Sequence, residues 1–145
     1  MRIAHAFLLS TLLTGAVVAQ QAPSRAPGTK NVAAISGGTY TADAGHTLVE
    51  WTVDHLGFTP YFGLFGNVTG TLMLDPKNPA AAKVDVTIPV AEVTTASAGL
   101  TKHLLKPAEE GKQADFFGAS PAAARFVSTK VTPSGQNAKI DGNLT

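Results

Sequence analysis

Residues 47–56, TLVEWTVDHL, alternate between two kinds of side chain with a period of two. One phase holds Val49, Trp51, Val53 and His55, and the other holds Leu48, Glu50, Thr52 and Asp54. Successive side chains of a β-strand point to opposite faces of its sheet, whereas a helix repeats every 3.6 residues. The segment is therefore predicted to be a strand with one buried face.

Other segments carry the same pattern. Val84, Val86 and Ile88 alternate with polar residues, and residues 39–41, 124–129 and 140–145 are further strand candidates. These strands, separated by turns rich in glycine and proline, predict an all-β fold.

Glycines interrupt the apolar segment that follows residue 60, at Gly63, Gly66 and Gly70. Strand glycines allow bulges and close approach of neighbouring backbones, as in a sheet that curls onto itself. They also occur in poorly ordered edge strands. We favour the curling sheet.

One region has helical character. Leu100, His103 and Leu104 follow the i, i+3, i+4 spacing of a short helix, which Pro107 would end. Asp115 is a candidate cap for a second brief helical turn.

The N-terminal region has the features of an export signal. Residues 1–19 combine Arg2, an apolar stretch and small residues near Ala19, as a cleaved signal peptide does, and the stretch is too short for a membrane anchor. Residues 20–38 are rich in Pro, Ser and Gly and are expected to be a flexible leader, so the folded domain is assigned to 39–145. The chain has no cysteine, which excludes a lipoprotein anchor and a disulfide framework.

The charge balance argues against polyanionic partners. Without Arg2, the chain would carry ten basic and ten acidic residues, and the basic ones are scattered singly. Nucleic acid and anionic membrane surfaces are therefore not expected as partners.

Signatures of catalysis and metal binding are missing from the sequence. It has no G-x-S-x-G, P-loop or G-x-G-x-x-G motif, and its histidines form neither HxH nor HExxH. We therefore expect a non-enzymatic protein without a metal or cofactor.

Aromatic residues offer an apolar lining. The inventory is Trp51, Phe58, Tyr61, Phe62, Phe65, Phe116, Phe117 and Phe126. Such residues either fill a core or surround a ligand cavity, and composition alone leaves both open. His55, on the apolar phase of its strand, could hydrogen-bond a ligand headgroup or a buried backbone carbonyl, and the same two roles apply to His103.

Several motifs occur together in a familiar order. They are TLVEWTVDHLG from residue 47, Gly63-Leu64-Phe65, Gly70-Thr71-Leu72, Asp75-Pro76, His103-Leu104, Asp115-Phe116-Phe117, Pro121 and Phe126-Val127-Ser128-Thr129. Over residues 40–145 the chain resembles the YceI-like family. The resemblance implies an antiparallel, lipocalin-like barrel with a short helical insertion, which encloses an isoprenoid lipid in the periplasm, and it leaves room for a homodimer.

On this resemblance, the candidate ligand-binding residues are Val49, Trp51, Val53, His55, Phe58, Phe62, Phe65, Val68, Leu72, His103, Leu104, Phe116, Phe117 and Phe126. The expected function is to carry or sequester a lipid of the quinone or prenyl phosphate type. The alternative is a periplasmic interaction or stress module whose barrel is packed solid.

The chain departs from the family pattern in three places. Leu100-Thr101 stands where members often carry an Arg-Asp pair, which calls a polar headgroup contact there into question. Residues 106–113 resemble an insertion able to reshape the pocket mouth. The family pattern continues beyond Gly142-Asn143-Leu144-Thr145, so the chain is interpreted as a C-terminally truncated member with an open barrel.

Overall fold

Antiparallel strands dominate the computed structural model, which describes residues 28–145. Residues 31–145 cluster as one unit, to which the following description applies. The predicted signal peptide and the first part of the leader lie outside the described residues.

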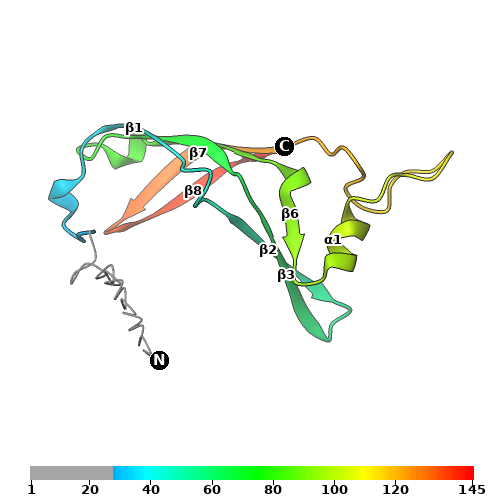
Figure 1. The fold of residues 1–145 in the computed structure, drawn as a ribbon. Coiled ribbons are helices and arrows are strands. Elements are labelled where there is room, and N and C mark those ends of the chain that lie inside the picture. The colour runs from blue at the N-terminus through cyan, green and yellow to red at the C-terminus, as the bar shows by residue number, and fades with distance from the viewer. Residues whose placement is uncertain (1–27) are drawn as a thin grey trace, which may run out of the picture. The chain divides into compact units, whose positions relative to one another are not determined.

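Eight strands are present in this part of the chain (Figure 1). They are β1 (Gly38–Thr41), β2 (Val49–His55), β3 (Thr59–Phe65), β4 (Thr69–Leu74), β5 (Lys83–Ile88), β6 (Val93–Thr95), β7 (Ala124–Ser134) and β8 (Asn137–Leu144). Three short 3₁₀ turns, η1 (Val32–Ala34), η2 (Pro79–Ala81) and η3 (Val90–Glu92), and one α-helix, α1 (Ala98–Leu104), complete the described elements.

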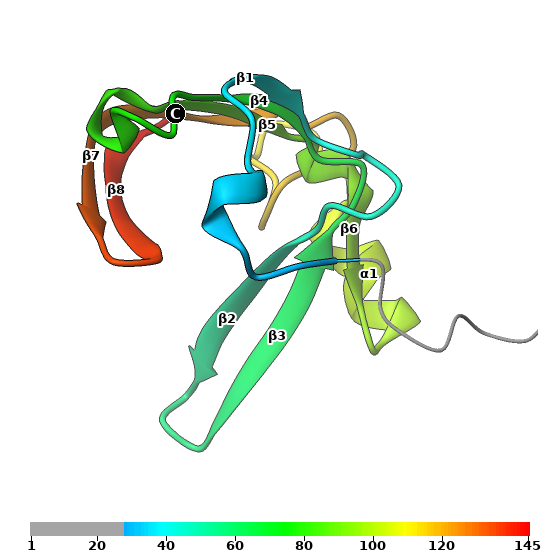
Figure 2. The ribbon, with the colours of Figure 1, turned by 90° about the vertical axis from the view of Figure 1, so that its left-hand side faces the viewer.

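The strands form two separate sheets. One has the order β1-β4-β5-β7-β8, and the other has the order β2-β3-β6. Every pairing between the described strands is antiparallel. Figure 2 shows the hairpin of β2 and β3 extending away from the larger sheet, with its turn at the free end. The predicted all-β, lipocalin-like fold with a short helical insertion and open sheets is confirmed.

Helix α1 matches the predicted spacing of Leu100, His103 and Leu104. Ser97 is its N-cap, and the Ser97 side chain accepts a hydrogen bond of 3.2 Å from the backbone N–H of Leu100. The second helical turn predicted at Asp115 is wrong, because residues 115–117 form bends. The backbone N–H of Phe117 donates to the carbonyl of Leu104, 3.0 Å away, so it bonds to the end of α1 rather than within a local turn.

Few side chains are fully buried. Within the described segment 28–145, the buried hydrophobic side chains are Val68, Val93, Leu104 and Val131. Large apolar side chains elsewhere on the strands are partly exposed, among them Tyr40, Val53, Phe62 and Met73. The described residues include no helix long and apolar enough to cross a membrane.

Candidate functional site

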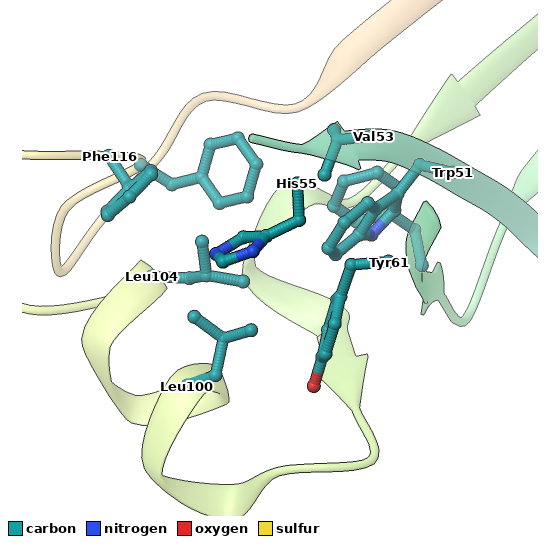
Figure 3. A pocket seen from close by; sticks show the side chains of 9 residues that line it. Trp51, Val53, His55, Tyr61, Leu100, Leu104 and Phe116 are labelled. Carbon is teal, nitrogen blue, oxygen red and sulfur yellow. The ribbon is translucent and has the colours of Figure 1, made fainter. Parts of the chain in front are cut away.

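An apolar hollow of about 580 Å³ lies between the β2–β3 hairpin and α1. The side chains that line it are Trp51, Val53, His55, Tyr61, Phe65, Leu100, Leu104, Phe116 and Phe117. Leu100 and Leu104 point from α1 toward the side chains carried by the hairpin (Figure 3). The volume of the hollow falls within the range of about 300–1,000 Å³ that small-molecule sites occupy.

The hairpin supplies one wall through strand alternation. Trp51, Val53 and His55 share one face of β2, and Tyr61 and Phe65 share the corresponding face of β3. Trp51 pairs with Gly63 across the ladder. A Cβ at Gly63 would lie 2.4 Å from Cζ2 of Trp51, so the missing side chain leaves room for the indole against β3.

A row of aromatic rings continues from the hairpin to the segment after α1. The ring centroids of Trp51 and Phe65 are 6.5 Å apart. Phe65 in turn meets Phe117 edge to face at 6.0 Å. The hydrogen bond from Phe117 to Leu104 brings the Phe116–Phe117 pair beside the hollow, although these residues are far from β3 in sequence.

Hydroxyl contacts attach α1 to the smaller sheet. The Oγ1 atoms of Thr95 on β6 and Thr101 on α1 are 3.0 Å apart, and Thr101 Oγ1 also accepts from the backbone N–H of Thr95 at 3.0 Å. Leu104, only 6% exposed, forms the buried end of the helix. These contacts fix the helical wall of the hollow relative to β6.

The lining is almost entirely apolar. His55 and Tyr61 are members of the lining whose side chains carry polar atoms, and no Asp, Glu, Lys or Arg of residues 28–145 belongs to it. Nε1 of Trp51 is buried and has no hydrogen-bond partner among the described residues. A hydrocarbon suits these walls, whereas an ion placed against them would lack a compensating charge.

The lining includes these predicted site residues: Trp51, Val53, His55, Phe65, Leu104, Phe116 and Phe117. The other candidates lie elsewhere. Phe58 is 90% exposed in the β2–β3 turn, and Phe62 is 58% exposed on the face of β3 opposite Tyr61. His103 is exposed and its ring meets that of Phe116 at 5.2 Å, which places it beside the hollow without lining it.

The remaining candidates belong to the sheets. Val68 is buried just before β4, Val49 is half-buried at the start of β2, and Leu72 is half-buried on β4. Phe126 lies on β7 with its ring over Gly142, at which a Cβ would come within 2.4 Å of the ring.

Two lining residues were not among the candidates. Tyr61 belonged to the aromatic inventory, and its strand phase, shared with Phe65, would have selected it over Phe62. Leu100 was recognised only as a helix position, yet its i, i+4 relation to Leu104 places both on one face of α1.

Shifted pKa values occur outside the hollow. Hydrogen bonds from Lys112 and then Lys106 lower the pKa of Glu109 in the loop after α1. A paired guanidinium, that of Arg125, lowers the pKa of Asp85 on the larger sheet. No cluster of potential metal ligands occurs in residues 28–145.

Comparison with known proteins agrees with this architecture. The family model of the YceI-like domain matches residues 40–145. Protein YceI of Escherichia coli O17:K52:H18 is 40% identical over 101 residues, and a UPF0312 protein of Pseudomonas aeruginosa (strain LESB58) is 39% identical over 101 residues. Each alignment covers 69% of this chain and 49% of the relative, so the chain spans about half the length of the curated relatives it matches.

The matched segment contains the hairpin, α1 and every residue that lines the hollow. The chain belongs to the YceI-like family.

Proposed function

We propose that the protein binds a long-chain isoprenoid lipid without catalysis and carries or sequesters it in the periplasm. The observation that supports this most directly is the hollow, whose walls are aromatic and aliphatic side chains from β2, β3 and α1. Such walls remove a hydrocarbon chain from water. Among the described residues they carry no charged side chain, so a ligand needs no charge to bind there.

Energetics favour a long chain over a short one. At ~0.8 kcal/mol per buried CH₂, one five-carbon prenyl unit contributes roughly 4 kcal/mol before losses. Association itself costs about 4–15 kcal/mol in lost translational and rotational freedom. Several prenyl units are therefore needed for stable binding.

The chemistry of the lining favours a neutral polar end. His55 and Tyr61 can hydrogen-bond a carbonyl or hydroxyl group, as in a quinone or a phenol. A phosphate inside the hollow would lose its hydration without gaining a cation, since no Lys or Arg lines the walls formed by residues 28–145. A prenyl phosphate would have to keep its headgroup in water.

The alternative of a solidly packed interaction module is less well supported. Phe116 and Phe117 are 53% and 40% exposed beside the hollow, and Val53 on the opposite wall is 49% exposed. In a packed interior these side chains would contact one another and exclude solvent.

The test uses the sole tryptophan, Trp51, which lines the hollow. Protein purified from the periplasm is extracted with organic solvent for mass spectrometry, and stripped protein is titrated with a prenyl quinone while Trp51 fluorescence is followed. We expect a co-purified isoprenoid and saturable quenching. Protein that carries no apolar lipid and takes up neither a prenyl quinone nor a prenyl phosphate would refute the proposal.

A further inference from the structure

The turn that joins β2 to β3 exposes two large apolar side chains. Leu56 is 78% exposed and Phe58 is 90% exposed. Turns of this length normally carry Gly, which adopts positive φ freely, or Asn, Asp and Ser, whose polar side chains hydrogen-bond the turn backbone and water. Phe62, 58% exposed, lies on the face of β3 that points away from the hollow.

The turn is held in a defined conformation. The backbone N–H of Phe58 donates to the carbonyl of His55 at 3.1 Å, and the N–H of Gly57 donates to Oδ1 of Asp54 at 2.8 Å. Leu56 and Gly57 have φ angles of 59° and 75°, as the central residues of a type I′ turn require. Asparagine or glycine would suit the backbone of Leu56 better, so the leucine points to a role for its side chain.

The charge of the hairpin excludes an anionic surface as its partner. Residues 49–65 contain Glu50 and Asp54 and no lysine or arginine. Binding to anionic lipid depends on basic side chains near the surface. The exposed apolar turn therefore suits an interface of net-neutral lipids, into which aromatic and aliphatic side chains partition without electrostatic help.

The turn is continuous with the hollow. His55, which lines the hollow, directly precedes Leu56, and Val53 lines it two residues earlier on β2. At about 3.3 Å per strand residue, the turn lies within a few ångströms of that wall. Figure 2 shows the turn at the free end of the hairpin, away from the larger sheet, where a flat surface can reach it.

We propose that this turn docks on a net-neutral lipid bilayer by inserting Leu56 and Phe58, and so places the His55 end of the hollow against the membrane. The inference rests on the proposed function, because a water-insoluble isoprenoid is exchanged with a bilayer. The contact is weak and reversible, since two side chains bury little area.

The experiment measures co-sedimentation of the purified protein with phosphatidylcholine vesicles. The test variant is Leu56→Asn with Phe58→Ser, because asparagine tolerates the left-handed conformation and keeps the turn. The matched control is Val32→Ser with Ile35→Ser, which removes exposed apolar side chains, 57% and 46% exposed, at η1. We expect at least a roughly tenfold weaker partition for the test variant and no change for the control.

Separate readouts keep the two proposals apart. Quenching of Trp51 by a prenyl quinone in detergent should be the same in the wild type and the test variant. If the protein carries no apolar lipid and binds neither a prenyl quinone nor a prenyl phosphate, but vesicle binding depends on the turn, the lipid-carrier function fails and the docking inference stands.

Three results would overturn the docking inference. One is a wild-type protein that does not sediment with vesicles, and another is equal loss of vesicle binding in both double variants. The third is a fall in the mass of the free protein when Leu56 and Phe58 are replaced, since the turn would then be an interface between protein chains.

Discussion

Trp51 lies directly opposite Gly63 in the β2–β3 ladder, and its indole occupies space that any larger residue at position 63 would need. A Cβ at Gly63 would lie 2.4 Å from Trp51 Cζ2 and 2.7 Å from the carbonyl oxygen of Thr94 on β6. One missing side chain therefore permits both the position of the indole and the close approach of β6.

Replacing Gly63 by alanine tests this relation. We expect Gly63→Ala to lower the free energy of unfolding by about 1–3 kcal/mol, as overpacking does, and to alter the near-ultraviolet circular dichroism of Trp51. Gly99→Ala is the matched control, because the nearest atom to a Cβ at that helix position is 3.7 Å away. Alanine at position 99 should leave the Trp51 spectrum unchanged and stabilise α1 slightly. Equal effects of both substitutions would contradict the proposed packing.

A charge on the wall of the hollow tests the lipid-binding proposal. Val53 faces the hollow and is 49% exposed, so Val53→Asp should fold, yet it should weaken prenyl-quinone uptake at least roughly tenfold by placing a carboxylate against hydrocarbon. Thr52→Asp introduces the same charge on the opposite face of β2 and should bind normally. Titration of Trp51 quenching measures both. If Val53→Asp bound the quinone as tightly as the wild type, the ligand would have to bind outside this hollow.

Strand alternation made the hairpin wall predictable from the sequence. The segment 47–56 contains the observed β2, and the predicted shared phase of Trp51, Val53 and His55 is the face that lines the hollow. This information is local, because backbone geometry alone decides which side chains share a face of a strand.

The phase of β3 was harder to assign. Tyr61 and Phe62 are both aromatic, and Gly63 interrupts the pattern with no side chain, so composition did not identify the inward face. The approach of Phe117 to the hollow depends on its hydrogen bond to Leu104, a non-local contact that periodicity does not reveal.

Stability should depend on pH through the pair of Asp85 and Arg125. Arg125 Nε and Nη2 donate to the two carboxylate oxygens of Asp85 at 2.8 and 2.5 Å. These hydrogen bonds lower the pKa of Asp85 below its usual value of 3.8, so the unfolded chain binds this proton more readily than the folded one. The stabilisation is present above pH 3.8 and is lost as the pH falls through the folded pKa.

Urea unfolding between pH 2 and pH 6 measures this contribution. We expect Asp85→Asn to lose stability near pH 6 and to converge with the wild type at the acid end. A double-mutant cycle with Arg125→Gln isolates the pair, and added salt should reduce the coupling because both side chains are partly exposed. A pH dependence that Asp85→Asn leaves unchanged would assign the acid sensitivity to other carboxyl groups.

The loop after α1 should be dispensable for the fold. The hydrogen bond from Phe117 to Leu104 closes the loop at its base, and residues 106–113 beyond it are exposed. Replacing residues 107–112 by Gly-Ser-Gly should preserve the quenching of Trp51 at saturation, and the loss of three residues from the loop lowers its closure cost by only about 0.3 kcal/mol.

Leu104→Ala is the contrasting variant, because it removes the buried side chain beside the same hydrogen bond and should cost about 2–5 kcal/mol. Urea unfolding and quinone titration compare the two variants. If shortening the loop abolished quinone binding while the protein stayed folded, residues 107–112 would have to contribute to the mouth of the hollow. That result would agree with the sequence-based prediction that the insertion at residues 106–113 reshapes the pocket mouth. Retained affinity with altered rates of uptake and release would assign the loop to ligand access, because the walls described by β2, β3 and α1 would then hold the lipid without it.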